Sequence, residues 1–397
     1  MSYSLRCFGG PFVMKLRHLL THLACLLILA GCNSKAPLGR DLAMSSSEWA
    51  SKAEFWVLSH QDSTGAHPYF FDPAVDRKIG RSHAFGELIA GHRIAQLASQ
   101  RSRLAAAHSA QLKAALSFFN PTGERSELAV DHNGTTTLGV NALLLRLLLE
   151  SSDRDYDASA HTEHLAGHII ESWDGSTGFP EFLGSQETKS VYLKRYYTGI
   201  AALALIEHFA ATQNQASLET AIAAVEWLEK QRPAKDRKAF HPSPTPWLVE
   251  ALNALNTVRP EQKYRDRIFA LADQFVALQD RDLFPGRFWS TKGPDFGPPN
   301  TVRDAQATRT LLTALELAWD IGETGRVRKY RGAVALALDN LRTHQYDAGA
   351  VETFPNPAGA VGAVRFRYDR SVVRIDGVIL SAMAFEQASK LAWQGKL

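Results

Sequence analysis

The stretch Arg195-Tyr196-Tyr197-Thr198-Gly199 leads directly into Ile200-Ala201-Ala202-Leu203, so a polar, aromatic tip is followed at once by an apolar run that continues to residue 213. The same order of tip and apolar run recurs five more times along the chain. The six tips begin at His83, Thr136, Tyr196, Thr245, Val302 and Arg374, at intervals of roughly 50 to 70 residues. An interval of this size fits one helical hairpin plus a variable loop, which indicates a repeated unit.

Helices of two kinds are expected to alternate between these tips. Ranges rich in Ala and Leu, which suit an inner ring, are 83–100, 135–151, 196–213, 246–256, 303–321 and 374–387. Ranges with one polar and one apolar face, which suit an outer ring, are 45–58, 103–119, 158–173, 218–230, 264–279 and 326–344. This alternation predicts an all-α fold, an (α/α)6 toroid of six helical hairpins. Residues 67–73 are expected to be extended.

The first residues carry the pattern of a secretory signal. Lys15 and Arg17 precede a mostly apolar run over residues 19–30, which is shorter than the roughly 20 apolar residues of a membrane-spanning helix. The run ends in Leu29-Ala30-Gly31-Cys32, which resembles the lipobox of bacterial lipoproteins. The resemblance implies cleavage before Cys32 and a lipid on its sulfur.

We therefore expect a signal peptide at 1–31, a lipidated tether at 32–45 and the toroid domain at 46–397. Acyl chains on Cys32 would hold the protein on a membrane. Asn33 after the cysteine favours the outer membrane, with the protein facing the periplasm of the cell envelope.

Charge and cysteine content exclude several classes of function. Loss of Arg6, Lys15 and Arg17 from 44 basic residues would leave a mature chain that is neutral against 41 acidic residues, so no nucleic-acid partner is expected. Only Cys32 of three cysteines would remain, which excludes a disulfide and a thiolate metal site. The histidines at 161, 164 and 168 share one helical face, but their apolar neighbours fit an outer helix that packs on the ring. We expect no metal and no cofactor.

The connections from outer to inner helices are long and chemically rich, whereas the opposite turns are short. Long loops at 173–182, 284–289, 294–299 and 351–369 combine aromatic, acidic and basic residues. Sites are usually placed in such loops at one end of a rigid scaffold. Aromatic rings stack on pyranose faces and charged groups bind hydroxyls or carboxylates, so the pattern suits a glycan. The alternative is that these aromatics fill the hollow of the ring.

Aligning the tips places Asp304 and Asp376 at equivalent positions on the fifth and sixth inner helices, which are neighbours in a closed ring. The two carboxylates could act as acid and base, with the pKa of one raised by the other. Alternatively, they stabilise helix N-termini and are neutralised by nearby arginines. Tyr196 and Tyr197 are candidate proton donors or stacking platforms. Candidate substrate-binding residues are Arg195, Trp247, Trp289, Arg303, Arg374, His83, Asp131 and His132.

The helical layout and the stretch from Tyr196 to Leu203 resemble six-hairpin glycosidases and the toroid domain of D-glucuronyl C5-epimerases. Arg374-Ile375-Asp376-Gly377 is similar to the last inner-helix tip of such folds. The resemblance implies polysaccharide substrates and acid–base work by tyrosines and carboxylates. It spans residues 46–395, and no separate β-domain of the kind that the epimerases carry is found.

Two hypotheses about function follow. The first is an envelope lipoprotein that binds a polysaccharide and processes it as a hydrolase, lyase or epimerase. The second is a non-catalytic lipoprotein that binds a glycan or a partner in envelope assembly or polysaccharide export. A serine-hydrolase motif of the type Gly-x-Ser-x-Gly and a glycine-rich phosphate loop are both absent from the sequence.

Overall fold

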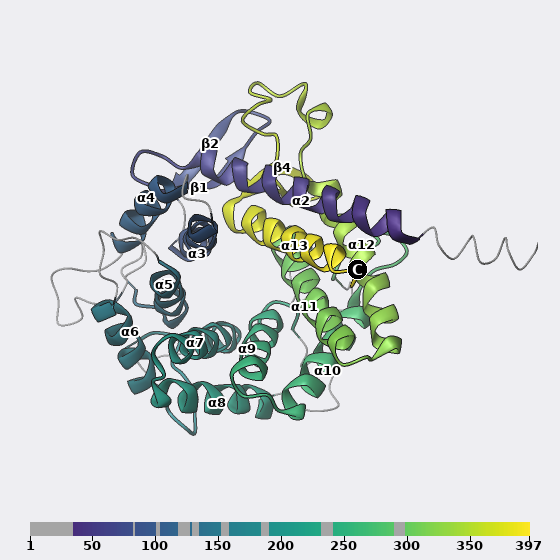
Figure 1. Cartoon of the computed structure of the whole chain (residues 1–397). Coiled ribbons are helices and arrows are strands. Elements are labelled where there is room, and N and C mark those ends of the chain that lie inside the picture. The colour runs from purple at the N-terminus through teal and green to yellow at the C-terminus, as the bar shows by residue number, and fades with distance from the viewer. Residues whose placement is uncertain are drawn as a thin grey trace, which may run out of the picture.

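Helices alternate between an inner and an outer ring in the computed structural model, which describes residues 35–81, 84–100, 104–117, 128, 135–151, 159–183, 190–231, 241–289 and 298–397 (Figure 1). The inner helices are α3 (Ala84–Gln100), α5 (Leu138–Glu150), α7 (Val191–Thr212), α9 (Thr245–Val258), α11 (Thr301–Asp320) and α13 (Ile375–Trp393). The outer helices are α2 (Lys35–His60), α4 (Ala105–Leu116), α6 (Ser159–Glu171), α8 (Gln215–Lys230), α10 (Gln262–Leu278) and α12 (Thr324–His344). The predicted (α/α)6 toroid is confirmed.

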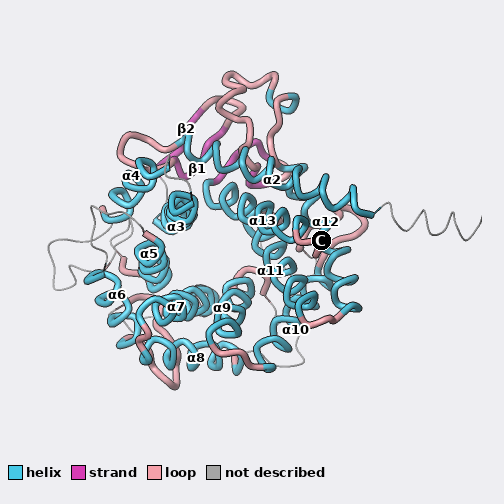
Figure 2. The backbone as a smooth tube through the Cα atoms, viewed as in Figure 1, coloured by secondary structure: helices cyan, strands magenta, loops and turns pink. Residues whose placement is uncertain are grey.

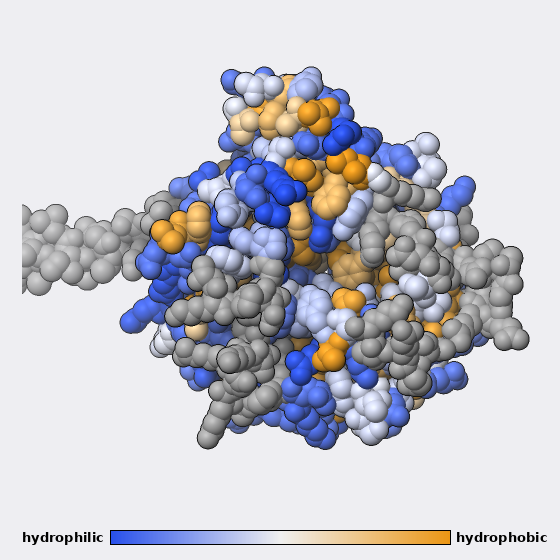
Figure 3. All heavy atoms as spheres, turned by 180° about the vertical axis from the view of Figure 1, so that it is seen from behind, coloured by the Kyte–Doolittle hydropathy of each residue, from blue (hydrophilic) through white to orange (hydrophobic). Residues whose placement is uncertain are grey.

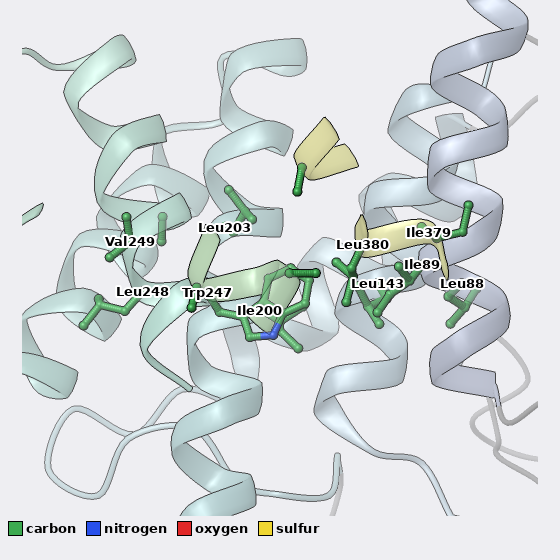
Figure 4. Close-up of a cluster of buried hydrophobic side chains, with 14 of the residues drawn as sticks. Leu88, Ile89, Leu143, Ile200, Leu203, Trp247, Leu248, Val249, Ile379 and Leu380 are labelled. Atoms are coloured by element: carbon green, nitrogen blue, oxygen red, sulfur yellow. The ribbon is translucent and has the colours of Figure 1, made fainter. Parts of the chain in front are cut away.

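Small residues allow the inner helices to approach one another closely. A Cβ atom at Gly199 of α7 would lie 3.0 Å from the Cβ of Trp247 on α9. A Cβ atom at Gly139 of α5 would lie 2.2 Å from the Tyr197 ring of α7. Leu143, Ile200 and other apolar side chains from several inner helices then form a buried core (Figure 4). Burial of each Leu or Ile contributes about 1.5–3 kcal/mol, so this core is the main source of the fold's stability.

Polar residues of the tips cap the inner helices. The side chain of Thr137 accepts a hydrogen bond from the N–H of Val140, and Ser190 and Asn300 do the same for α7 and α11. Such caps satisfy N–H groups that have no partner within the helix. Pro246 lies in the first turn of α9, where its missing N–H is not needed, as the sequence predicted.

A small antiparallel sheet joins the first and last outer-to-inner connections. Its strands are β1 (Pro68–Asp72), β2 (Arg77–Arg81), β3 (Arg365–Arg367) and β4 (Arg370–Arg374), in the order β2-β1-β4-β3. Phe70 pairs with Arg374, and Phe71 pairs with Val373. The extended stretch at 67–73 is confirmed, but its partners were not predicted, because they lie about 300 residues away in the chain. Figure 2 shows the sheet at the edge of the helical ring.

Contacts between α2 and α13 close the ring. Ser389 on α13 donates to the carbonyl of Ala43, and the rings of Trp49 and Phe385 meet edge to face, so the two helices run antiparallel. Helix α2 begins at Lys35, and Ala43 is buried. The described part of the segment predicted to be a tether is therefore helical from Lys35. Cys32 and the signal sequence lie outside the described residues. Within the described residues, no helix is long and apolar enough to cross a membrane.

Ion pairs tie neighbouring inner helices together below their tips. Arg93 of α3 pairs with Glu386 of α13 at 2.8 Å, and Arg93 also pairs with Glu54 of α2. In the same way, Arg146 pairs with Glu207 between α5 and α7, and Arg309 pairs with Glu250 between α11 and α9, both at 2.7 Å. Each buried arginine is thus neutralised by a neighbouring helix, as buried charges require.

Candidate functional site

The long outer-to-inner connections converge at the end of the ring where the inner helices begin. Figure 3 views the molecule from the side opposite to Figure 1, and its surface is hollowed near the middle between hydrophobic and hydrophilic side chains. We call this hollow and its rim the mouth. Around Tyr196 of α7, the neighbouring described side chains come from α3 (Phe85), α9 (Trp247), α11 (Gln306) and α13 (Asp376).

Aromatic side chains from three parts of the chain surround Tyr196. The Tyr196 ring lies 5.7 Å from Phe85, 5.9 Å from Tyr192 and 6.2 Å from Trp247, measured between ring centroids. Tyr192 also lies 4.6 Å from the ring of His241, just before α9. Such aromatic pairs contribute about 0.5–1.5 kcal/mol each beyond their buried area, so the cluster is a rigid wall of the mouth.

Tyr196 and Trp247 direct polar groups into this wall. Burial, reinforced by Tyr192, raises the pKa of Tyr196 well above its ordinary value, although the side chains of Trp247 and Gln306 act in the opposite direction. The Trp247 ring lies between Tyr196 and Arg146, whose Cζ is 5.8 Å from it. Trp247 is 2% exposed, and its Nε1 is buried beside the Tyr196 hydroxyl without forming a well-aligned hydrogen bond to any described residue. A buried donor that is only weakly satisfied is unusual, and here it lies next to the hydroxyl of Tyr196.

Asp376 lies on the same side of the mouth and is held by Arg374. Arg374 donates from Nε to one carboxylate oxygen at 2.6 Å and from Nη2 to the other at 2.5 Å, and the N–H of Gly377 adds a third bond. The Arg374 guanidinium lies 4.4 Å from the Phe366 ring and 5.9 Å from the Tyr69 ring. The Asp376 charge also acts on the Tyr196 hydroxyl. Asp376 is therefore fixed in position and neutralised by an arginine.

Asp304 faces a different environment. One of its oxygens accepts from the N–H of Phe288 at 3.0 Å, and the other accepts from Nδ2 of Asn340 on the outer helix α12 at 3.2 Å. Burial raises the pKa of Asp304 to about 6, and the hydrogen bonds from Phe288 and Asn340 oppose this shift. The cause is burial rather than Asp376, which corrects the mechanism expected from the sequence. The described contacts do not bring the two carboxylates together.

The other predicted residues occupy several places. Arg195 donates to the carbonyl of Gln231 at 2.7 Å, which ties the tip of α7 to the end of α8. Tyr197 packs against Gly139 and so fills the contact between α5 and α7. Arg303 is buried and donates to Ser243 at 3.3 Å. Trp289 is half-buried in the connection before α11. His83, Asp131 and His132 lie outside the described residues.

The histidines predicted to share one face lie on α6. The rings of His164 and His168 meet edge to face at 4.8 Å. In the described ranges, no three or more His, Cys, Asp or Glu side chains are grouped so that they could hold a metal ion.

Sequence reasoning missed several residues of the mouth. Tyr192 lies one helical turn before Tyr196, and this spacing could have identified it. Gln306 acts on the Tyr196 hydroxyl, whereas Asp304 on the same helix contacts the outer layer. Two residues along a helix correspond to a rotation of about 200°, so the side chains of Asp304 and Gln306 point in opposite directions.

The arrangement defines the chain as an (α/α)6 toroid with an aromatic, polar mouth, and solved toroids share its fold. The α-1,6-mannanase GH76A from Salegentibacter sp. HEL1_6 matches with a TM-score of 0.63 and 12% identity, over 87% of this chain and 99% of that chain. A D-mannose isomerase matches with a TM-score of 0.68 and 14% identity, over 88% and 97%. The family 76 mannosidase Bt3792 from Bacteroides thetaiotaomicron VPI-5482 matches with a TM-score of 0.60 and 13% identity, over 88% and 100%.

These likenesses establish the fold. No protein-family profile matches the chain, and no curated protein matches it in sequence. An inactive variant of the Salegentibacter mannanase, in which two consecutive aspartates are replaced by asparagine, was solved in complex with α-1,6-mannotriose.

Proposed function

We propose that the protein binds a glycan in the mouth of its toroid and processes it on the side of Tyr196 and Asp376. The observation that carries this proposal is the convergence of the Tyr196 hydroxyl, the neighbouring Nε1 donor of Trp247 and the Asp376 carboxylate within an aromatic wall. Aromatic faces with a few convergent polar groups suit a sugar ring. The likeness to toroids that act on mannan or mannose supports the same class of ligand.

The two side chains suit different roles in a reaction on the sugar. Because burial raises the pKa of Tyr196, its hydroxyl keeps its proton and can donate a hydrogen bond to a sugar oxygen on which negative charge develops. Asp376 has two fixed oxygens that can accept a hydrogen bond or a proton from the sugar. A hydrolase, a lyase or an epimerase could use such a donor and acceptor.

The proposed groups differ from those of the mannanase. That enzyme is inactive when two consecutive aspartates are replaced, whereas this chain has no two consecutive acidic residues anywhere in its sequence. We therefore assign the polar roles in the reaction to Tyr196 as hydrogen-bond donor and Asp376 as acceptor, and not to an adjacent pair of aspartates.

A non-catalytic glycan-binding protein is the second candidate. It is favoured by the carboxylates themselves, because Asp376 is neutralised by Arg374 and Asp304 is bonded to Phe288 and Asn340. Asp304 and Asp376 are thus both bound by other groups of the protein, and they do not form a free pair that could act as acid and base. On this reading, Tyr196 and Trp247 hold the sugar and no bond is broken.

Binding and turnover should be measured in parallel, with α-1,6-mannotetraose, D-mannose and a galacturonate oligosaccharide as probes. Trp247→Phe removes Nε1 but keeps an aromatic ring, and it should weaken binding about threefold to tenfold. If the protein is an enzyme, Tyr196→Phe and Asp376→Asn should lower turnover about 100-fold or more and change binding only severalfold. Binding without turnover supports the second candidate. The proposal is wrong if Trp247→Phe and Tyr196→Phe both bind every probe as the wild type does.

We also propose that Cys32 carries the lipid and holds the protein on the outer membrane, facing the periplasm. Helix α2 begins at Lys35 and runs antiparallel to α13, so its first residues lie at the end of the ring opposite the mouth. A lipid just before α2 would therefore leave the mouth facing away from the bilayer. Cys32→Ser should move the protein from the membrane fraction to the soluble fraction, and persistence in the membrane fraction would contradict the anchor.

A further inference from the structure

Positive charge is concentrated on the small sheet beside the mouth. The basic residues of its strands are Arg77, Lys78, Arg81, Arg365, Arg367, Arg370 and Arg374, and Asp72 is their acidic residue. The processed chain as a whole would be neutral, so this concentration is local. Figure 1 shows the sheet next to the connection that joins α12 to α13.

A cavity of about 410 Å³ opens between the β3–β4 hairpin and this connection. Its walls include the aromatic residues Tyr346, Phe354 and Tyr368 and the basic residues Arg365 and Arg370. The volume falls within the range of small-molecule sites, which is about 300–1,000 Å³. We call it the hairpin cavity.

The hairpin cavity presents more positive than negative charge. Arg370 is exposed and forms no direct ion pair among the described residues, although its charge helps to lower the pKa of Asp369. Arg365 donates from Nη2 to the carbonyl of Thr343 at 2.9 Å and lies 5.8 Å from the Tyr346 ring. The acidic side chain in the wall is Asp369, and Arg367 binds both of its oxygens and lowers its pKa. Arg365 and Arg370 therefore dominate the charge of the cavity.

The same hairpin connects the cavity with the mouth. Tyr368 lines the hairpin cavity, and Phe366, two residues earlier, contacts the Arg374 guanidinium that holds Asp376. The hairpin cavity therefore adjoins the Arg374–Asp376 pair through one short hairpin. A glycan of several sugar units in the mouth could continue across the hairpin into the cavity.

We propose that the hairpin cavity binds an anionic sugar unit, a uronate in the simplest case, of the glycan whose next units occupy the mouth. The inference rests on the proposed function and adds that the substrate is an acidic glycan. Arginine suits carboxylate recognition because its planar guanidinium donates several hydrogen bonds in a fixed geometry. The aromatic walls favour a sugar over the phosphate backbone of a nucleic acid or a flat lipid surface, since neither requires a concave aromatic site.

The test compares binding of hexagalacturonate and of α-1,6-mannotetraose to the full chain by calorimetry at low and physiological ionic strength. Arg370→Gln should raise the Kd for hexagalacturonate about threefold to tenfold and leave the Kd for mannotetraose unchanged. Arg328→Gln is the matched control, because Arg328 is an exposed arginine at the start of α12, far from the hairpin. It removes the same charge and should change neither Kd.

The aromatic wall provides a second variant. Tyr368 is 43% exposed, so Tyr368→Ser should fold normally and should weaken hexagalacturonate binding severalfold. Equal effects of Arg370→Gln and Arg328→Gln would overturn the proposal. So would binding of single-stranded DNA or of vesicles with anionic phospholipid that depends on Arg370 but not on Tyr368, since that outcome indicates a general anion surface.

Failure of the inference can be distinguished from failure of the proposed function. Trp247→Phe tests the mouth, whereas Arg370→Gln tests the hairpin cavity. If Trp247→Phe weakens binding of both sugars and Arg370→Gln weakens neither, the mouth binds glycans and the cavity proposal is wrong. If only Arg370→Gln has an effect, the cavity binds acidic sugars without the mouth, and the proposed function is wrong.

Discussion

Asp304 and Asp376 hold the same position on neighbouring inner helices, but they have opposite surroundings. Asp304 is 3% exposed and bonds to the connection before α11 and to the outer helix α12. Asp376 bonds to Arg374 at the end of β4 and acts on Tyr196 across the mouth. The difference shows that equivalent positions in a repeat can serve different layers of a toroid, one as a buried anchor of the outer layer and the other as a group of the site.

The neighbouring segments explain this divergence. The segment that carries Arg287 and Phe288 covers the tip of α11. The Asp304 side chain therefore accepts a hydrogen bond from the backbone N–H of Phe288. The tip of α13 follows a strand, and that strand supplies an arginine two residues before the carboxylate. If this comparison is right, changes at Asp304 affect mainly stability, and changes at Asp376 affect mainly function.

The largest expected effect is that of Asp304→Ala on stability. The substitution leaves the buried N–H of Phe288 and the amide of Asn340 without their acceptor. Each unsatisfied group costs about 1–3 kcal/mol, so the free energy of unfolding should fall by about 2–4 kcal/mol. Denaturant titration measures this loss. A loss below about 1 kcal/mol, together with lost turnover, would place Asp304 in the site instead.

The free energy of unfolding should also depend on pH through Asp304, with a change similar in size to the loss expected for Asp304→Ala. Burial raises its pKa from 3.8 to about 6, so the folded protein binds the proton more tightly than the unfolded chain does. The contribution of Asp304 is therefore most favourable below pH 4, and it is lost as the pH rises through about 6. The whole change is about 3 kcal/mol at most.

Asp304→Asn is the reference for this measurement, because it removes the titrating group. The unfolding free energy of the wild type, relative to this variant, should decrease between pH 4 and pH 7. Parallel curves for the two proteins would show that Asp304 does not titrate in this range.

A smaller effect on stability is expected for Asp376→Asn. Its ion pair with Arg374 is largely buried, with the arginine side chain 21% and the aspartate side chain 8% exposed, but asparagine keeps an acceptor for Arg374, whose guanidinium also retains its ring contacts. Loss of the charge-assisted bonds should lower the free energy of unfolding, measured by denaturation, by about 1–2 kcal/mol. Binding and turnover of glycan should change much more. If Asp376→Asn greatly lowered stability and left binding and turnover unchanged, Asp376 would be a structural residue like Asp304.

The smallest effect on stability is expected for Tyr196→Phe, at about 1 kcal/mol, because the ring and its aromatic contacts remain and only the interactions of the hydroxyl with Trp247 and Gln306 are lost. The pKa of the wild-type hydroxyl is raised by burial, so ligand binding should show no titration of this group between pH 7 and pH 10. Binding measured across this range in the wild type and in Tyr196→Phe checks the point. A decrease below pH 9 that is absent from the variant would mean that Tyr196 loses its proton there.

Local patterns were sufficient to predict the helices and their order. The spacing of Leu and Ala in α5 and α7, and caps such as Ser190, involve residues within a few turns of one another. Trp247 and Tyr196 were also predicted as site residues; their rings lie 6.2 Å apart, and their role in a site stays a prediction. The direction of Asp304 was not predicted, since it depends on Asn340, which lies on another helix.

By itself, the sequence determined that hairpins of helices repeat and close into a ring, because apolar spacing and caps act over a few residues. Only the tertiary structure decided which tips face the mouth, and it alone paired β1 with β4 to build the basic sheet and the hairpin cavity. Those features depend on contacts between segments about 300 residues apart, and the residues in one such segment carry no local sign of their partner.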